Sequence, residues 1–206
     1  MLAAAVLLAP SSVYSETQGE AKGITEYQSL RYGSEGELLG YGMHQYDEGG
    51  RKISTGWYEP AKGNVGNTRF EYDESGRLIR ESLYDKTESM LLGYTDYTYS
   101  DGEKREAVSY TARGERLSSL AFEYDGEGRP VRETGYGEEG TVREIILHEY
   151  DEEGGLAKSS VYGPEGKELV SYALYEHDSQ GNLTRMTVYA PDGSVYWYVR
   201  HLWGEP

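Results

Sequence analysis

A repeat of about 26 residues limits the fold of this chain more strongly than any other feature of its sequence. Its six blocks begin at Tyr46, Tyr72, Tyr99, Tyr124, Tyr150 and His177, at intervals of 25 to 27 residues. A second tyrosine follows each of these residues by 11 or 12 positions, at Tyr58, Tyr84, Tyr110, Tyr136, Tyr162 and Tyr189. A repeat of this kind predicts an array of similar units, each of which contacts mainly its neighbours.

The residues between the repeated tyrosines predict β-structure throughout. Each block opens with a short polar run that ends in glycine, as in Tyr-Asp-Glu-Ser-Gly from Tyr72, which is typical of a tight turn. Runs rich in Tyr, Leu, Val, Thr and Ser separate the turns and show no helical period. We therefore predict one all-β domain over residues 16–206, an antiparallel β-meander forming one long twisted or curled sheet.

The composition indicates that tyrosine supplies the core of this sheet. Leu, Ile, Val and Phe make up only 36 of the 206 residues, and the net charge is −16, a combination typical of disorder. The 21 tyrosines and 27 glycines oppose that reading, because tyrosine favours strands and regularly spaced glycine marks turns. The negative charge argues against nucleic acid or an anionic lipid surface as a partner.

The repeat also predicts side-chain rows and ion pairs. The block-opening residues should form a row near one edge of the sheet, and the second tyrosines a row near the other. Pairs of opposite charge recur at a spacing of nine residues: Glu71 with Arg80, Glu123 with Arg132, Glu149 with Lys158, and Glu176 with Arg185. We expect these to be diagonal cross-strand pairs on one face, unless a bulge shifts the register.

The beginning of the chain indicates export. Residues 1–15 carry no charge and contain an apolar run followed by small residues, a pattern that fits a secretory signal without its basic region. The run is too short for a transmembrane helix. Cysteine is absent, so disulfides, thiolate metal sites and a cysteine nucleophile are excluded. We expect a secreted, periplasmic or cell-surface protein of a bacterium.

The blocks that open at Tyr72, Tyr124 and His177 resemble the YD repeats of RHS-type proteins, which follow the pattern Tyr-Asp-x-x-Gly-Arg/Asn-Leu. The resemblance covers about residues 32–200 and is most specific in the first half of each block. It implies secreted or surface proteins whose hairpins form a spiralling strip. The period here is longer than in that family, and the chain is too short to enclose a cargo as the large members do.

Motifs for catalysis or metal binding are missing. The four histidines, His44, His148, His177 and His201, lack metal-ligand spacing, and the sequence has neither a nucleophile elbow nor a phosphate-binding glycine loop. We expect no enzyme and no cofactor. An alternative for the turn carboxylates, such as those of Asp47, Asp73 and residues 151–153, is a Ca²⁺ site.

The aromatic residues near the end of the chain are the best candidates for ligand contact. These expected contact residues are Tyr196, Trp197, Tyr198 and Trp203, together with Trp57. We expect a non-catalytic binding or scaffolding module with a protein or glycan partner at the cell envelope. The alternatives are a carbohydrate-binding module that uses the tyrosine and tryptophan rows and, more distantly, a hydrolase with unrecognised carboxylates. Exposed terminal strands would also permit edge-to-edge self-association.

Overall fold

A computed structural model of the chain describes residues 26–203, which fold into fourteen antiparallel strands and no helix. The strands are β1 (Glu26–Gly33), β2 (Leu38–Tyr46), β3 (Lys52–Glu59), β4 (Gly63–Tyr72), β5 (Leu78–Tyr84), β6 (Leu91–Ser100), β7 (Glu103–Thr111), β8 (Arg116–Tyr124), β9 (Pro130–Tyr136), β10 (Val142–Tyr150), β11 (Leu156–Tyr162), β12 (Leu169–His177), β13 (Leu183–Tyr189) and β14 (Val195–Leu202). Each strand pairs with the next, so the predicted meander is confirmed. The predicted signal segment, residues 1–15, lies outside the described residues.

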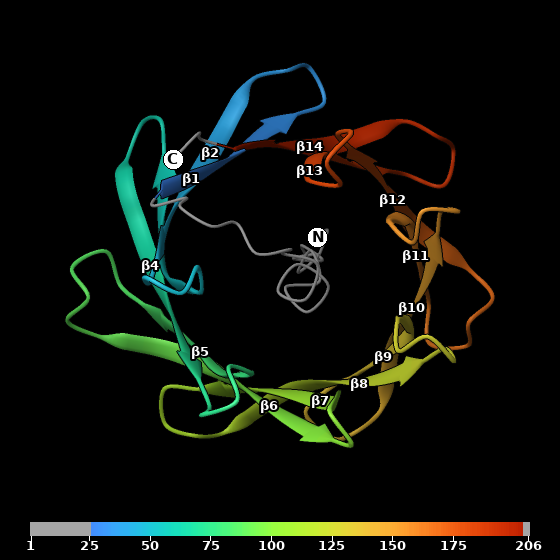
Figure 1. Ribbon diagram of the computed structural model, residues 1–206, viewed down its shortest axis with the longest axis horizontal. Helices are drawn as coiled ribbons and strands as arrows, with labels where there is room; N and C mark the ends of the chain where they lie inside the picture. Colours follow the sequence, from blue (N-terminus) through green and yellow to red (C-terminus); the bar gives the residue numbers. More distant parts are fainter. Residues whose placement is uncertain (1–25, 204–206) are drawn as a thin grey trace.

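The sheet closes into a barrel, and the prediction of an open twisted or curled sheet was wrong. β1 pairs with β14, and Figure 1 shows the two strands side by side where the ring of strands meets itself. The rings of Tyr32 and Tyr198 stack across this seam with centroids 5.0 Å apart. Sheet twist accumulates from strand to strand, and closure pairs backbone groups that an open sheet would expose. The backbone groups of β1 and β14 therefore pair with each other, and neither strand is an edge available for self-association.

The turns divide between the two ends of the barrel. One end, which we call the Asp-turn end, carries the block-opening turns at residues 47–51, 73–77, 101–102, 125–129, 151–155 and 178–182. The other, the β1–β2 end, carries the turns at residues 34–37, 60–62, 85–90, 112–115, 137–141, 163–168 and 190–194.

The block-opening turns are built as their sequence predicts. In the turn after β4, the Asp73 carboxylate accepts hydrogen bonds from the amides of Ser75 and Arg77, both at 2.9 Å. Gly76 has a φ of +82°, a conformation that favours glycine. Hydrogen bonds from the Arg77 amide and side chain hold the pKa of Asp73 below its ordinary value. The aspartate therefore has a structural role in closing its own turn.

A bulge next to each turn sets the register of the hairpins. Between β4 and β5, Glu71 faces Arg80 and Tyr72 faces Leu78, which leaves Ile79 without a partner. The extra residue places all four nine-residue charge pairs directly opposite one another, where diagonal pairs were expected. Three of them form ion pairs with N···O distances of 2.9, 3.4 and 3.9 Å. The fourth arginine, Arg80, pairs with Asp96 on β6 at 2.5 Å instead.

The two tyrosine rows lie on opposite faces of the barrel wall. The block-opening residues face inward, where the Tyr72 hydroxyl donates a 2.8 Å hydrogen bond to the carbonyl oxygen of Lys52. Equivalent bonds link Tyr99 to Leu78 at 2.8 Å and Tyr150 to Pro130 at 2.7 Å. The second tyrosines face outward and stack on tyrosines of the neighbouring strand in the pairs Tyr41–Tyr58, Tyr94–Tyr110 and Tyr172–Tyr189.

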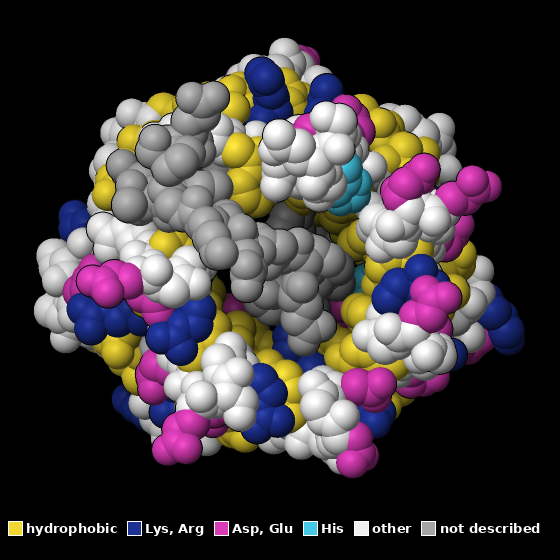
Figure 2. Space-filling model, in the orientation of Figure 1, with side chains coloured by type: hydrophobic (Ala, Val, Ile, Leu, Met, Phe, Trp, Pro, Cys, Tyr) yellow, Lys and Arg dark blue, Asp and Glu magenta, His cyan; other side chains and the backbone are white. Residues whose placement is uncertain are grey.

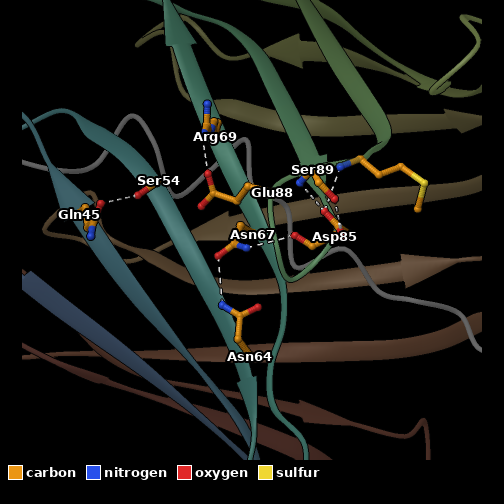
Figure 3. Close-up of polar contacts among 9 residues, drawn as sticks. Gln45, Ser54, Asn64, Asn67, Arg69, Asp85, Glu88 and Ser89 are labelled. Carbon is orange, nitrogen blue, oxygen red and sulfur yellow. Dashed lines mark hydrogen bonds and ion pairs between the residues drawn. The ribbon is translucent and has the colours of Figure 1, made fainter.

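The outer face of the wall carries charged and polar side chains in addition to the stacked tyrosines. Figure 2 shows basic and acidic side chains next to one another around the rim that faces the viewer. The outer side of β2 to β5 carries the hydrogen bonds drawn in Figure 3, among them Gln45 with Ser54 and Asn64 with Asn67, and the ion pair of Arg69 with Glu88. The apolar packing instead lies inside, in clusters around Met186 and Phe122.

Candidate functional site

A belt of side chains runs around the inside of the barrel at one level. Every even-numbered strand contributes an aromatic residue or histidine two positions before its block-opening residue, or its equivalent on β14, namely His44, Phe70, Tyr97, Phe122, His148, Tyr175 and His201. Each lies directly opposite an inward residue of the next odd-numbered strand, in order Thr55, Glu81, Ala107, Glu133, Ser159, Met186 and Ser29. The belt therefore closes around the barrel through the His201–Ser29 pair at the seam.

A continuous hydrogen-bond chain occupies the belt from β9 to β12. His148 Nε2 lies 3.0 Å from Glu133 Oε1, and His148 Nδ1 lies 2.8 Å from Ser159 Oγ. The Tyr175 hydroxyl lies 3.1 Å from the same serine oxygen. Ser, His and Glu at these distances are the residue types of a hydrolytic triad. However, Ser159 is only 3% exposed and its hydroxyl is shared by two neighbours, so this arrangement leaves no approach for a substrate carbonyl.

Four repeats earlier, His44 occupies the position equivalent to His148, but both of its hydrogen-bond partners are hydroxyl groups and neither is a carboxylate. His44 Nδ1 lies 2.8 Å from Thr55 Oγ1, and His44 Nε2 lies 3.2 Å from Ser29 Oγ. Burial lowers the pKa of His44 to about 3, with a smaller contribution from the nearby Lys52 ammonium. Burial likewise lowers the pKa of His201 to about 4. These two imidazoles are therefore neutral at physiological pH and help to pack the belt.

Buried charged side chains lie in the belt, at Glu81, and on its Asp-turn side, at Lys52 and Lys104. Lys104, 1% exposed, places its ammonium 4.9 Å from the centroid of the Tyr97 ring and 5.7 Å from that of Phe122. Burial lowers the pKa of Lys52 and raises that of Glu81, and the attraction between the two charges opposes both shifts. Charges on aromatic faces and opposite an acid can remain in a dry interior. The charged side chains on this part of the wall are thus buried against aromatic rings and opposite charges.

The inner wall at the β1–β2 end has a different character. Trp57 pairs with Gly42 and Leu83 pairs with Gly93, so both side chains face inward, yet they are 41% and 43% exposed. Most of the neighbouring inward positions on β1 to β6 are glycine: Gly33, Gly40, Gly42, Gly66 and Gly93. Small residues leave space inside the wall, so large side chains remain accessible there.

The Trp57 ring has a defined position on this wall. It lies against Gly42, where a Cβ atom would be only 3.1 Å from ring atom Cζ3. Its Nε1 donates a 3.0 Å hydrogen bond to Thr68 Oγ1, and the ring meets His44 edge-on with centroids 6.3 Å apart. Two strands away, the Arg31 guanidinium stacks over Trp197 at 4.7 Å from the ring centroid. The two indoles and Arg31 form the candidate site at the β1–β2 end, and Leu83 lies on the same inner wall two strands beyond Trp57.

The predicted contact residues separate into three places. Trp57 and Trp197 lie on the inner wall near the β1–β2 end, on either side of β1 and β2. Tyr198 faces outward against Tyr32, and Tyr196 is 50% exposed at the start of β14. Trp203 lies beyond β14 at the Asp-turn end, where its Nε1 donates a 2.8 Å hydrogen bond to the carbonyl oxygen of Leu183. Neighbouring residues of a strand point to opposite faces, so these five residues do not share one surface.

Arg31, Leu83 and the belt residues were not identified as candidates from the sequence. The belt had a readable signal, because strand alternation places the residue two positions before each inward tyrosine on the same face. Arg31 had none, because its contact with Trp197 follows from the pairing of β1 with β14 across the closed seam.

The turn carboxylates show no metal cluster. Within residues 26–203 no group of three or more His, Cys, Asp or Glu residues is placed to hold a metal ion. Several of the aspartates considered for Ca²⁺, including Asp47 and Asp73, bind amides of their own turns. The Ca²⁺ alternative gains no support from this geometry.

Comparisons with known proteins relate the chain to other barrels. No protein-family model matches the sequence, and no curated protein matches it either, so the resemblance to YD repeats is not confirmed. No helix in the described part of the chain is long and apolar enough to span a membrane. The barrel is similar in fold to a porin-like protein from Bacteroides uniformis, with a TM-score of 0.51 and 11% identity over 88% of this chain and 98% of that one.

Two weaker similarities were also found. A porin-like protein from Bacteroides vulgatus has a TM-score of 0.41 and 11% identity, over 89% of this chain and 99% of that one. The Tc holotoxin pore of Photorhabdus luminescens has a TM-score of 0.36 and 16% identity, over 79% of this chain and 9% of that one. The similarity to the Bacteroides uniformis protein concerns the barrel fold alone, so the function has to be argued from the site itself.

Proposed function

We propose that the chain is an exported, non-catalytic binding protein whose barrel admits a ligand at the β1–β2 end. One observation carries this proposal: Trp57 and Leu83 point into the barrel and yet remain 41% and 43% exposed. Inward apolar side chains in a filled barrel are buried, as Met186 at 2% and Leu156 at 4% are. An accessible aromatic and aliphatic wall with few polar groups is the usual lining of a ligand site.

The number of strands supports this proposal. Barrels of about eight strands have interiors that side chains just fill or that hold one small ligand, and the diameter grows with strand number. Fourteen strands enclose a wider interior. Bulky residues of the belt and the tyrosine row line it on the Asp-turn side, whereas glycines line much of the wall of β1 to β6 at the other end.

The outer face favours a barrel that works in water. Arg132, Lys158 and Arg185 face outward from the strands, together with the glutamates that pair with them. A lysine or arginine on the lipid face of a membrane barrel costs about 2–4 kcal/mol at the midplane. The signal-like residues 1–15 favour export, so we place the protein in the bacterial envelope or outside the cell.

Binding of the fluorescent apolar probe N-phenyl-1-naphthylamine tests this function. The full chain should bind it saturably with enhanced emission. Leu83→Asp, which puts a carboxylate on the inner wall, should weaken binding at least about tenfold, equivalent to about 1.4 kcal/mol. The matched control is Leu174→Asp, because Leu174 is similarly exposed, at 38%, but faces outward. Absence of binding, or equal losses in the two variants with unchanged circular dichroism, would refute an interior site.

A further inference from the structure

We infer that the ligand of the β1–β2 end is a neutral oligosaccharide that lies along the inner wall from Trp197 to Trp57. This inference rests on the proposed function, since it assigns a chemical class to the ligand of the same site. The argument uses the spacing of the two indoles, the wall between them and the charges beside them.

The two indoles are placed for an extended ligand. Trp197 is on β14 and Trp57 is on β3, and the two strands β1 and β2 lie between them. Trp57 is level with Gly42, Ser29 and His201, so Trp197 lies three inter-strand steps away and four residues further along β14. At about 4.8 Å per step and about 3.3 Å per residue, the two indoles are about 19 Å apart along the wall. One sugar ring cannot contact both indoles at that separation, whereas a short chain of rings can place one ring on each.

The wall between the indoles is low on β2, whereas on β1 the Arg31 side chain stands beside Trp197. Gly40 and Gly42 face inward there, so no side chain of β2 rises between the two rings. A Cβ at Gly42 would crowd both the Trp57 ring, at 3.1 Å, and Ser29 Oγ, at 2.8 Å. Glycine therefore allows Trp57 to lie against the wall with much of its surface free. A sugar ring presents a flat C–H face that packs on such a surface.

The charged groups at the site have both signs. The exposed Arg31 guanidinium lies over Trp197, and no ion pair joins it to an acidic residue among residues 26–203. The Glu37 carboxylate lies against Gly33, the residue directly opposite Trp197. Across the barrel, Glu144 faces inward beside Gly135, and burial raises the pKa of its carboxyl. An arginine donor and a glutamate acceptor thus flank the same indole.

This pair of opposite charges selects among ligand classes. An anionic ligand on Arg31 would approach Glu37, and a cationic ligand on Glu37 would approach Arg31. A purely apolar ligand can contact Trp57 and Leu83, but along the wall to Trp197 it would cover Arg31 and Glu37 without replacing their hydrogen bonds to water, which carries a penalty. A neutral sugar avoids these conflicts, because each hydroxyl both donates and accepts, so neighbouring hydroxyls can satisfy arginine and glutamate together.

Calorimetric titration of the full chain with hexasaccharides tests this inference. The neutral probes are N-acetylchitohexaose, cellohexaose, maltohexaose and xylohexaose, and the charged probes are hexagalacturonate and the chitosan hexamer. We expect saturable binding of at least one neutral hexasaccharide, at least about tenfold tighter than either charged one. Trp57→Ala and Trp197→Ala should each weaken that binding about tenfold, as expected for the loss of one aromatic contact. Tyr198→Leu, next to Trp197 but on the outer face, should leave it unchanged.

Three results would overturn the inference. They are no binding by any neutral probe, tighter binding of a charged one, or neutral binding that survives both tryptophan substitutions. If N-phenyl-1-naphthylamine still binds in a Leu83-dependent manner, only the sugar assignment fails and the proposed function stands. If that probe also fails to bind, the proposed function fails with it.

Discussion

The two ends of this barrel use one repeat for different purposes. At the Asp-turn end, inward tyrosines are tied by hydrogen bonds to carbonyl groups of the wall, as Tyr72 is to Lys52 at 2.8 Å. At the β1–β2 end, the inner positions of β1 to β6 include glycines next to accessible large residues, as at Gly42 and Trp57. The contrast indicates that the residues of each strand near the Asp-turn end stabilise the closed barrel, whereas the residue types near the β1–β2 end can differ from repeat to repeat.

The largest effect we predict compares the loss of one aromatic side chain at each end. Tyr72→Ala should lower the free energy of unfolding by about 3–5 kcal/mol, because it removes packing and a hydrogen bond inside the wall. Trp57→Ala should cost about 1–2 kcal/mol, because much of that ring is already in contact with water. Urea unfolding of both variants measures the difference. Equal losses would mean that the two ends are packed alike.

The belt between the two ends gives a prediction about pH. The folded-state pKa values of His44 and His201, about 3 and 4, lie below the unfolded value near 6.5. The unfolded chain therefore binds more protons, and stability is lost as the pH falls from about 6.5 toward 4. Each histidine contributes a slope of up to about 1.4 kcal/mol per pH unit.

The variant His44→Phe should reduce this slope, since Phe70 and Phe122 hold equivalent belt positions. Denaturation at pH 7, 6 and 5 gives the slope directly. Because the variant also removes a partner of Thr55, the slope is the readout and the absolute stability is not. A slope unchanged by the substitution would show that His44 does not titrate as a buried group.

A smaller effect is expected from single hydrogen bonds at the two ends. Tyr72→Phe removes only the bond to the Lys52 carbonyl and should cost about 1 kcal/mol. Thr68→Val removes the acceptor of the Trp57 indole and should cost less than about 0.5 kcal/mol, because water can replace it at an exposed site. Thermal or urea unfolding distinguishes the two. A Thr68 variant as unstable as the Tyr72 variant would indicate a dry β1–β2 end.

The smallest effect should come from the outer face, which belongs to neither end. Glu149→Gln removes the charge from a pair with Lys158 in which both side chains are well exposed. Exposed ion pairs contribute about 0.2–1 kcal/mol, so the loss should be at the lower end and should shrink in high salt. Unfolding measured at about 50 mM salt, where screening is weak, and at about 500 mM salt, where it is strong, tests this. A loss above the range would imply a structural role for the outer charges.

Much of the fold could be predicted from the repeat. The strands, the turns at residues such as Asp73 and Gly76, and the two tyrosine rows all follow from local chemistry that the sequence displays. Closure was not predictable in the same way, because it depends on twist summed over fourteen strands. The bulges, as at Ile79, were also hidden, and they placed the charge pairs directly opposite one another rather than diagonally.

The candidate site was predictable only in part. Trp57 and Trp197 were selected as aromatic residues, and both lie on the inner wall of one end. Tyr196 and Tyr198 were selected for the same reason, yet Tyr198 faces outward. Composition identifies residue types that suit a ligand, whereas the face of a strand residue depends on register, which the bulges shift. Arg31 enters the site only through the pairing of the first strand with the last.

The central claim is that a ligand enters at the β1–β2 end and reaches Trp57 but not Trp203. The most direct test is acrylamide quenching of two single-tryptophan variants, with lifetimes measured with and without saturating N-phenyl-1-naphthylamine. One variant, Trp197→Phe with Trp203→Phe, retains Trp57, and the other, Trp57→Phe with Trp197→Phe, retains Trp203. We predict that the probe lowers the quenching constant of Trp57 severalfold and leaves that of Trp203 unchanged. Protection of Trp203, or equal protection of both tryptophans, would contradict the account.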